Sequence, residues 1–366
     1  MRHFQGSASP GVGARALGSW GQGGLTIPRA AGWGVLPIPA SGYPWWTHPM
    51  TQPVHLSAQW QADEGLSRSE YRRLLARGDL VALRRGVCAI AESLSPAATH
   101  LRLARAVALQ RAGPVFSHAT AALALGLPVD AASLGRVRVI REVGHAQLLR
   151  DVHETQGPLR PGDVTVVGGL RVTSVPRTVI DLARDCPLEW GVVAADAALH
   201  KGLCSHDDLV RAVGEAKGRR GVHRARRAIT FADGAAESPL ESVSRVAIHR
   251  ASIPKPILQH PVLLSGSVVA RGDFAWPDFH VIGECDGAAK YTDLLAPGQT
   301  AKEAIMAEKR RENLIREAGW WLVRWDWADA WHADRLGARI RAAFSWRSPT
   351  LGSAHTPWMQ DARNAS

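Results

Sequence analysis

The chain has 366 residues, which is too long for one ordinary core, and we expect two or three domains. Charged residues make up 21% and apolar residues 46% of it, so the composition excludes a largely disordered chain. The formal net charge of +11 favours a polyanionic partner, usually nucleic acid, although a membrane surface would also fit the charge.

Apolar runs in the chain all fall short of the ~20 residues that a membrane-spanning helix needs, so we expect a soluble protein with no membrane partner. The four cysteines are scattered and are never paired at the spacing of metal ligands: Cys88, Cys186, Cys204 and Cys285. This pattern favours structural thiols in a reduced, cytoplasmic protein.

The first 62 residues contain no Asp or Glu and are rich in Gly, Pro, Ala and Ser. We expect residues 1–53 to form a disordered leader. The apolar stretch at 34–39 is too short for a signal peptide and is interrupted by prolines. Translation could begin at Met1 or at Met50, and the second choice would remove most of the leader.

Residues 54–95 have the pattern of a winged helix-turn-helix. A short helical pattern covers 55–62, and a capping box from Ser67 to Glu70 predicts a second helix that ends at Gly78. Two apolar runs then flank a basic turn, as in a β-hairpin. Such a module would place its second helix in the major groove of DNA, while the alternative is a small helical domain with a solvated basic face. The residues that would contact DNA are Arg68, Arg72, Arg73, Arg77, Arg84 and Arg85.

The end of this segment, Leu83-Arg84-Arg85-Gly86-Val87-Cys88-Ala89, resembles the N-terminal domain of AbiEi-type antitoxins. The resemblance covers about residues 55–93. It implies a DNA-binding, autoregulatory role in a type IV toxin-antitoxin system and a cognate toxin as partner. In this broad family the domain is also fused to other modules.

Residues 96–235 predict a mixed α/β middle region. Its helices are expected at 97–112, 117–125, 178–184 and 192–199, and its strands at 136–141 and 164–173. His118 is expected to start a helix. The most basic stretch of the chain, 217–227, fits either a phosphate-contacting patch or an ordinary solvated face.

Three carboxylates near residue 280 have the spacing of a metal site. Glu284 and Asp286 are two residues apart on a predicted strand and so share a face, while Cys285 points to the opposite layer. A turn at Pro277 would bring Asp273 of the preceding strand beside them. Oxygen ligands suit Mg²⁺, and such an ion would polarise a phosphate and lower the pKa of an attacking water. The alternative is that these acids are merely solvated at strand ends.

Three further elements complete the C-terminal region. A helix at about 237–251 carries Glu237 and Glu241 one turn apart. A charged helix is expected at 300–318, with its apolar side made of Ala304, Ile305, Leu314 and Ile315. A last strand is expected at 320–327, whose tryptophans we assign to the core.

Residues 236–346 resemble a restriction-endonuclease-like domain, and more closely an actinobacterial group related to very-short-patch-repair endonucleases. The matching motifs are Glu237-Ser238-Pro239-Leu240-Glu241-Ser242, Gly272-Asp273-Phe274-Ala275-Trp276-Pro277, Gly283-Glu284-Cys285-Asp286-Gly287, Lys290-Tyr291, Glu308-Lys309-Arg310-Arg311-Glu312 and Gly319-Trp320. The resemblance implies an α/β domain with a central mixed sheet, followed here by a flexible tail at 347–366.

In the wider superfamily an Asp is followed by Glu-x-Lys, which corresponds here to Asp273 and Glu284. The position of the lysine is occupied by Asp286, so Lys290 or Lys309 would have to supply the cation. The resemblance also suggests Glu241 as an accessory acid, while a solvated pair of Glu237 and Glu241 fits the sequence equally well.

The sequence therefore predicts an α+β multidomain protein that binds DNA and has a Mg²⁺-dependent endonuclease domain. In that function, catalysis falls to Asp273, Glu284, Asp286, Lys290 and Glu241, and metal binding to Asp273, Glu284 and Asp286. The alternative is a non-catalytic antitoxin and transcriptional autoregulator that uses a degenerate nuclease fold.

Overall fold

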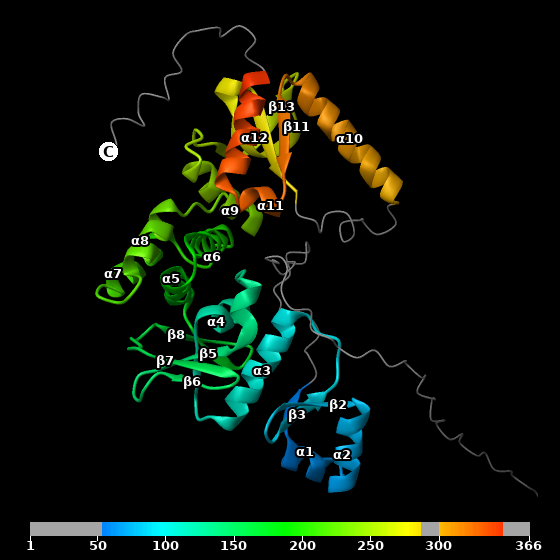
Figure 1. The fold of residues 1–366 in the computed structure, drawn as a ribbon, viewed down its shortest axis with the longest axis vertical. Helices are drawn as coiled ribbons and strands as arrows, with labels where there is room; N and C mark the ends of the chain where they lie inside the picture. Colours follow the sequence, from blue (N-terminus) through cyan, green and yellow to red (C-terminus); the bar gives the residue numbers. More distant parts are fainter. Residues whose placement is uncertain (1–52, 287–299, 347–366) are drawn as a thin grey trace, which may run out of the picture. The chain divides into compact units, whose positions relative to one another are not determined.

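The computed structural model describes residues 53–286 and 300–346 (Figure 1). Within these ranges the chain is a mixed α+β protein whose strands form three separate sheets, which confirms the fold class at this coarse level. The tail, Lys290, Met50 and all but the last residue of the predicted leader lie outside the described residues.

The N-terminal module contains two helices and a three-stranded antiparallel sheet of order β1-β3-β2. Its elements are β1 (Val54–Leu56), α1 (Ser57–Asp63), α2 (Arg68–Arg77), β2 (Leu80–Arg84) and β3 (Val87–Ile90). The capping box is confirmed, since Ser67 Oγ accepts from the Glu70 amide and Glu70 accepts from the Ser67 amide. Gly78 ends α2 in the left-handed conformation. The helical prediction is wrong at His55 and Leu56, which pair with Cys88 and Val87 in the sheet.

The middle module is built on a six-stranded mixed sheet of order β6-β7-β5-β4-β9-β8. Its first elements are α3 (Pro96–Gln110), β4 (Val115–Phe116), α4 (His118–Ala124), β5 (Val137–Arg141), β6 (Gln147–Leu148), β7 (Val152–Gln156), β8 (Val164–Val167) and β9 (Leu170–Thr173). His118 starts α4 as expected. The strand sequence at 164–173 divides into an antiparallel hairpin because Gly168 and Gly169 both have positive φ, as a tight hairpin turn requires.

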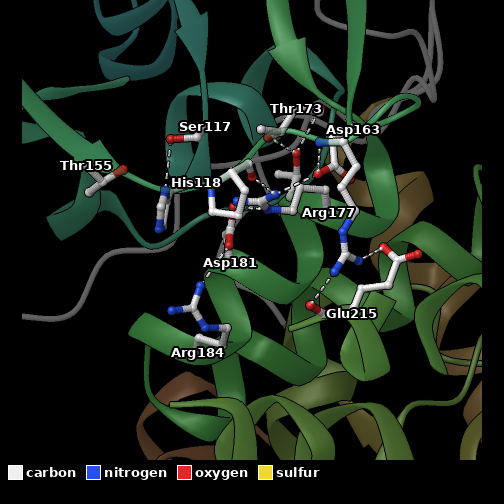
Figure 2. Close-up of polar contacts among 12 residues, drawn as sticks. Ser117, His118, Thr155, Asp163, Thr173, Arg177, Asp181, Arg184 and Glu215 are labelled. Atoms are coloured by element: carbon white, nitrogen blue, oxygen red, sulfur yellow. Dashed lines mark hydrogen bonds and ion pairs between the residues drawn. The ribbon is translucent and has the colours of Figure 1, made fainter. Parts of the chain in front are cut away.

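Four helices follow the sheet: α5 (Val175–Asp185), α6 (Leu188–His200), α7 (His206–Glu215) and α8 (Val222–Phe231). A buried polar network holds α5 to the loop before β8 (Figure 2). Arg177 donates from Nη1 to Asp163 at 2.8 Å and from Nε to Asp181 at 2.8 Å. All three side chains are buried, so the loss of any one of them would leave an uncompensated charge away from water.

The C-terminal module has a four-stranded mixed sheet of order β10-β11-β12-β13, with only the last pair parallel. Its elements are α9 (Pro239–Arg250), β10 (Ile257–Leu264), β11 (Ser267–Trp276), β12 (Val281–Cys285), α10 (Ala301–Glu317), β13 (Trp321–Trp325), α11 (Trp327–Ala330) and α12 (Ala333–Trp346), with a short 3-10 helix at Pro277–Phe279. Helices α9 and α12 pack on one face of the sheet and α10 packs on the other (Figure 1).

Two expectations for this module are wrong. The last strand stops at Trp325, because Asp326 caps α11 by accepting from the Asp329 amide, so Trp327 is helical. On α10, Ile315 is fully buried but Ile305 is 51% exposed. The core on this side of the sheet therefore includes only the C-terminal half of α10.

Helices α6 and α9 pack against each other across the predicted boundary at 235/236. Trp190 and Val193 of α6 belong to the core of the C-terminal module, and Val246 of α9 belongs to the core of the middle module. The boundary therefore runs through a packed interface. None of the helices in the described ranges is long and apolar enough to cross a membrane.

Candidate functional site

The pairing of β11 with β12 places Asp273 beside Glu284. The register pairs Phe274 with Gly283, and the Cys285 amide donates to Asp273 Oδ2 at 2.9 Å. Glu284 lies on the face that α10 covers, because Ile282, two residues earlier on β12, belongs to the core on that side. Cys285 belongs to the core on the opposite face, as expected from the sequence.

Glu241 joins Asp273 from the first turn of α9. Its side chain is only 5% exposed, and it accepts hydrogen bonds from the Glu237 amide at 3.0 Å and from Gln259 Nε2 at 2.7 Å. Burial raises the pKa of Glu241 to about 7, and the negative charge of Asp273 contributes to the rise. The accessory acid suggested by the sequence thus lies within electrostatic reach of Asp273.

Glu284 is only 4% exposed and is held by two arginines. Arg311 of α10 donates to Oε1, and Arg324 of β13 donates from Nε to Oε2 at 3.2 Å. Glu308 of α10 contacts the same two guanidiniums. Although burial opposes it, the hydrogen bond from Arg311 to Glu284 and the nearby carboxylates raise the pKa of Arg311.

The remaining predicted residues of this site differ in what they contact. Asp286 directly follows β12, and its Oδ2 lies 3.9 Å from Arg324 Nε. Glu284 and Asp286 therefore both reach Arg324. Lys309 is exposed on α10, and the cations that contact Glu284 are arginines instead.

The oxygen atoms of Glu241 and Asp273 suit a hard cation such as Mg²⁺. Burial is the main cause of the raised pKa of Glu241 and repulsion by Asp273 adds to it, and a divalent ion would relieve that repulsion. Across residues 53–286 and 300–346, no group of three or more His, Cys, Asp or Glu side chains is placed to hold a metal. Two carboxylates still fit Mg²⁺, because this ion commonly takes one or two from the protein and completes its shell with water and substrate phosphates.

The arginines predicted to contact DNA fall into two groups. Arg77 pairs with Asp79 at 3.1 Å, and Arg84 pairs with Asp151 of the middle module at 2.6 Å. The Arg84 side chain is mostly covered, so it is engaged within the protein. The others are exposed on α2 or at the hairpin tip: Arg68, Arg72, Arg73 and Arg85.

Sequence reasoning did not identify Arg311, Arg324 and Gln259 as members of the site. The spacing of Glu308 and Arg311, three apart on a helix, was one available signal. Arg324 lies opposite Glu284 in the parallel ladder of β12 and β13. That register depends on tertiary structure, so the sequence offered no direct sign of it.

No protein-family model matches the chain. It is 34% identical over 157 residues to "Uncharacterized protein MT2308" of Mycobacterium tuberculosis strain CDC 1551 / Oshkosh, and equally to "Uncharacterized protein Rv2248" of strain H37Rv. The match covers 43% of this chain and 55% of each relative. The chain therefore spans about half the length of these curated relatives, whose names state no activity.

Proposed function

We propose that the protein binds DNA and hydrolyses its phosphodiesters in a Mg²⁺-dependent reaction at the C-terminal sheet. The observation that carries this proposal is the convergence of Glu241 from α9 and Asp273 from β11 next to Glu284. A mixed sheet with the Asp on one strand and the Glu on the next is also what the resemblance to restriction-endonuclease-like domains implies.

Each residue would have a distinct part in the reaction. Asp273 and Glu241 would hold the ion, which when bound polarises the scissile phosphate and lowers the pKa of water. The pKa of Glu241, about 7 without an ion because of burial and the charge of Asp273, would fall when Mg²⁺ binds, since the positive ion favours the ionised carboxylate. Arg311 and Arg324 bring positive charge to the edge of the site, where a phosphate would carry negative charge.

DNA binding is assigned to the N-terminal module, whose helices and hairpin follow the order of a winged helix-turn-helix. The support is the exposure of Arg68, Arg72 and Arg73 on α2. In such modules this helix enters the major groove, and arginines on its surface neutralise phosphates or read base edges.

Plasmid nicking by the purified full-length chain tests the catalytic proposal. We expect nicking with Mg²⁺ and none with EDTA, and we expect Asp273→Asn to abolish it. The matched control is Asp278→Asn, because Asp278 is exposed on the turn between the same two strands. Nicking that survives Asp273→Asn would exclude this site, and no nicking with any divalent metal would exclude the enzyme.

The second candidate is a non-catalytic DNA-binding regulator, and the observation that favours it is the pairing of Glu284 with Arg311 and Arg324. These contacts neutralise a carboxylate that a nuclease would use for metal, and Asp286 occupies the lysine position. Under this proposal the chain retards DNA containing its own promoter without cutting it. A neighbouring reading frame for a nucleotidyltransferase-like toxin would support the antitoxin role.

A further inference from the structure

A cavity of about 510 Å³ opens in the middle module, away from the carboxylates of the C-terminal sheet. The loop between α3 and β4, the end of β5 and Arg171 of β9 line it, together with Glu154 of β7. Its size lies within the range of roughly 300–1,000 Å³ that is typical of small-molecule sites.

Glu154 organises the cationic side of this cavity. Its side chain is 1% exposed, and its two oxygens pair with Arg111 and with Arg141 Nη1, the latter at 3.2 Å. Two guanidiniums carry many more N–H donors than two carboxylate oxygens can accept. Burial lowers the pKa of Arg111, and the positive charges of Arg84 and Arg141 lower it further, which shows how closely these cations are crowded.

Arg171 brings a third guanidinium to the same cavity. Its Nη1 donates to the Gly113 carbonyl at 2.8 Å. Gly113 has a φ of 56°, and a Cβ there would lie 2.9 Å from Arg171 Nη1, so glycine permits this close approach. Glu142 also lines the cavity, but its Oε1 accepts from the Leu159 amide at 3.3 Å.

The cavity wall also has an apolar part. Val115, Val139 and Ile140 line it and are otherwise buried in the sheet. A cavity with convergent guanidiniums on one side and aliphatic side chains on the other suits a ligand that has an anionic group and a flat or apolar body.

We propose that this cavity binds a small phosphorylated molecule of nucleotide size. Guanidiniums form paired, charge-assisted hydrogen bonds with phosphate oxygens. A ligand with a single carboxylate would need fewer than the three guanidiniums that line this cavity. The cavity has the volume of a site for one small molecule, so we assign it to a free nucleotide and not to the backbone of DNA. This site is separate from the proposed nuclease and does not depend on it.

Isothermal titration calorimetry on the full-length chain tests this assignment. The probes are the mono- and triphosphates of adenosine, guanosine, cytidine and uridine, with inorganic phosphate and a duplex oligonucleotide as comparisons. We expect saturable binding of at least one nucleotide, tighter than that of inorganic phosphate. Arg171→Gln and Arg141→Gln should each weaken it about 10-fold or more, the effect of losing a charged hydrogen bond.

The matched control is Arg211→Gln, which changes an exposed arginine of α7 outside the cavity and should leave nucleotide affinity unchanged. Arg141 is 55% exposed, so its replacement should not prevent folding, which circular dichroism will check. The proposal is overturned if no nucleotide binds, if inorganic phosphate binds as tightly as every nucleotide, or if only the oligonucleotide binding depends on Arg141 and Arg171.

Discussion

Asp273 of β11 accepts a hydrogen bond on Oδ2 from the backbone amide of Cys285 in β12, at 2.9 Å. The Cys285 thiol lies 3.4 Å from the same oxygen. The sheet itself therefore orients this carboxylate, and Asp273 is held next to Glu284 before any ligand arrives. Preorganisation of this kind is what a metal site or a catalytic acid requires.

Asp273→Asn should abolish the stabilisation of the protein by Mg²⁺. If Asp273 and Glu241 hold the ion, Mg²⁺ at about ten times its dissociation constant adds about 1.4 kcal/mol to the stability of the native state. That gain corresponds to a rise of a few degrees in the melting temperature. Scanning fluorimetry at pH 8, with and without Mg²⁺, measures it.

Asp278→Asn is the control and should keep the full response to Mg²⁺. An equal rise in melting temperature for the native chain and for Asp273→Asn would remove Asp273 from the metal site. This readout does not require turnover, so it separates metal binding from nuclease activity.

Glu241→Gln should stabilise the protein at high pH. The folded pKa of about 7 lies above the ordinary value of 4.5, so the folded state loses stability as pH rises between these values and carries the full cost above about pH 7. The neutral amide avoids that cost. We expect a gain of about 1–3 kcal/mol at pH 8 that disappears near pH 4.5, measured by urea unfolding without divalent metal.

Glu237→Gln is the matched control, one helical turn earlier. Glu237 pairs with Arg271 at 2.7 Å on the surface, so its neutralisation should give no gain at pH 8. If Glu241→Gln has the same effect at pH 4.5 and pH 8, the carboxylate of Glu241 does not have the raised pKa that its burial beside Asp273 implies.

Local sequence signals predicted the elements that depend on neighbouring residues. The Ser67 to Glu70 capping box and the glycine end of α2 are confirmed, because each involves contacts within a few residues. The approach of Asp273 to Glu284 was also predictable, since a short turn joins their two strands.

Features that depend on distant pairing could not be predicted in this way. His55 is in a strand because β3, more than thirty residues later in the sequence, supplies its partner Cys88. The sequence predicts a metal-binding role for Glu284, but Arg324 contacts it from β13, forty residues later. No pattern of neighbouring residues in the sequence predicts that Arg311 and Arg324 both contact Glu284.

Gly283→Ala should destabilise the C-terminal module. A Cβ at this position would lie 2.5 Å from Trp325 Cη2 and 2.7 Å from Cζ3. Trp325 cannot easily move, because it is buried and its Nε1 donates to Ser244 at 2.8 Å. Overpacking of this kind costs about 1–3 kcal/mol, which thermal or urea unfolding would detect.

The control for this change is Gly214→Ala on α7, where a Cβ would meet nothing within 4 Å. Alanine is the better helix former, so this variant should be stabilised by up to about 1 kcal/mol. Equal stability of Gly283→Ala and the native chain would mean that Trp325 is not packed against β12 as described.

Arg245→Met should destabilise the interface of α6 and α9, and more strongly at high pH. Arg245 Nη1 donates to Asp196 Oδ2 at 2.6 Å, and both side chains are buried. Burial raises the pKa of Asp196 to about 6 while Arg245 opposes the rise, so removal of Arg245 should raise this pKa further. Breaking such a pair costs about 3–5 kcal/mol where Asp196 is ionised.

The sign of the pH dependence follows from the direction of the shift. The folded pKa of Asp196 lies above its ordinary value of 3.8. At low pH Asp196 is neutral, so the stability of the variant is then closest to that of the native chain. As pH rises through the folded pKa, Asp196 becomes charged without its partner and the stability of the variant falls. Urea unfolding at pH 5 and pH 8 should therefore show a larger loss at pH 8. Arg211→Met is the control, because its ion pair with Asp208 on α7 is exposed, and it should cost at most about 1 kcal/mol at either pH. Adding Asp196→Asn to Arg245→Met should restore part of the lost stability, because the uncompensated charge is then gone. If Arg245→Met lowers the stability equally at both pH values, Arg245 acts through packing alone.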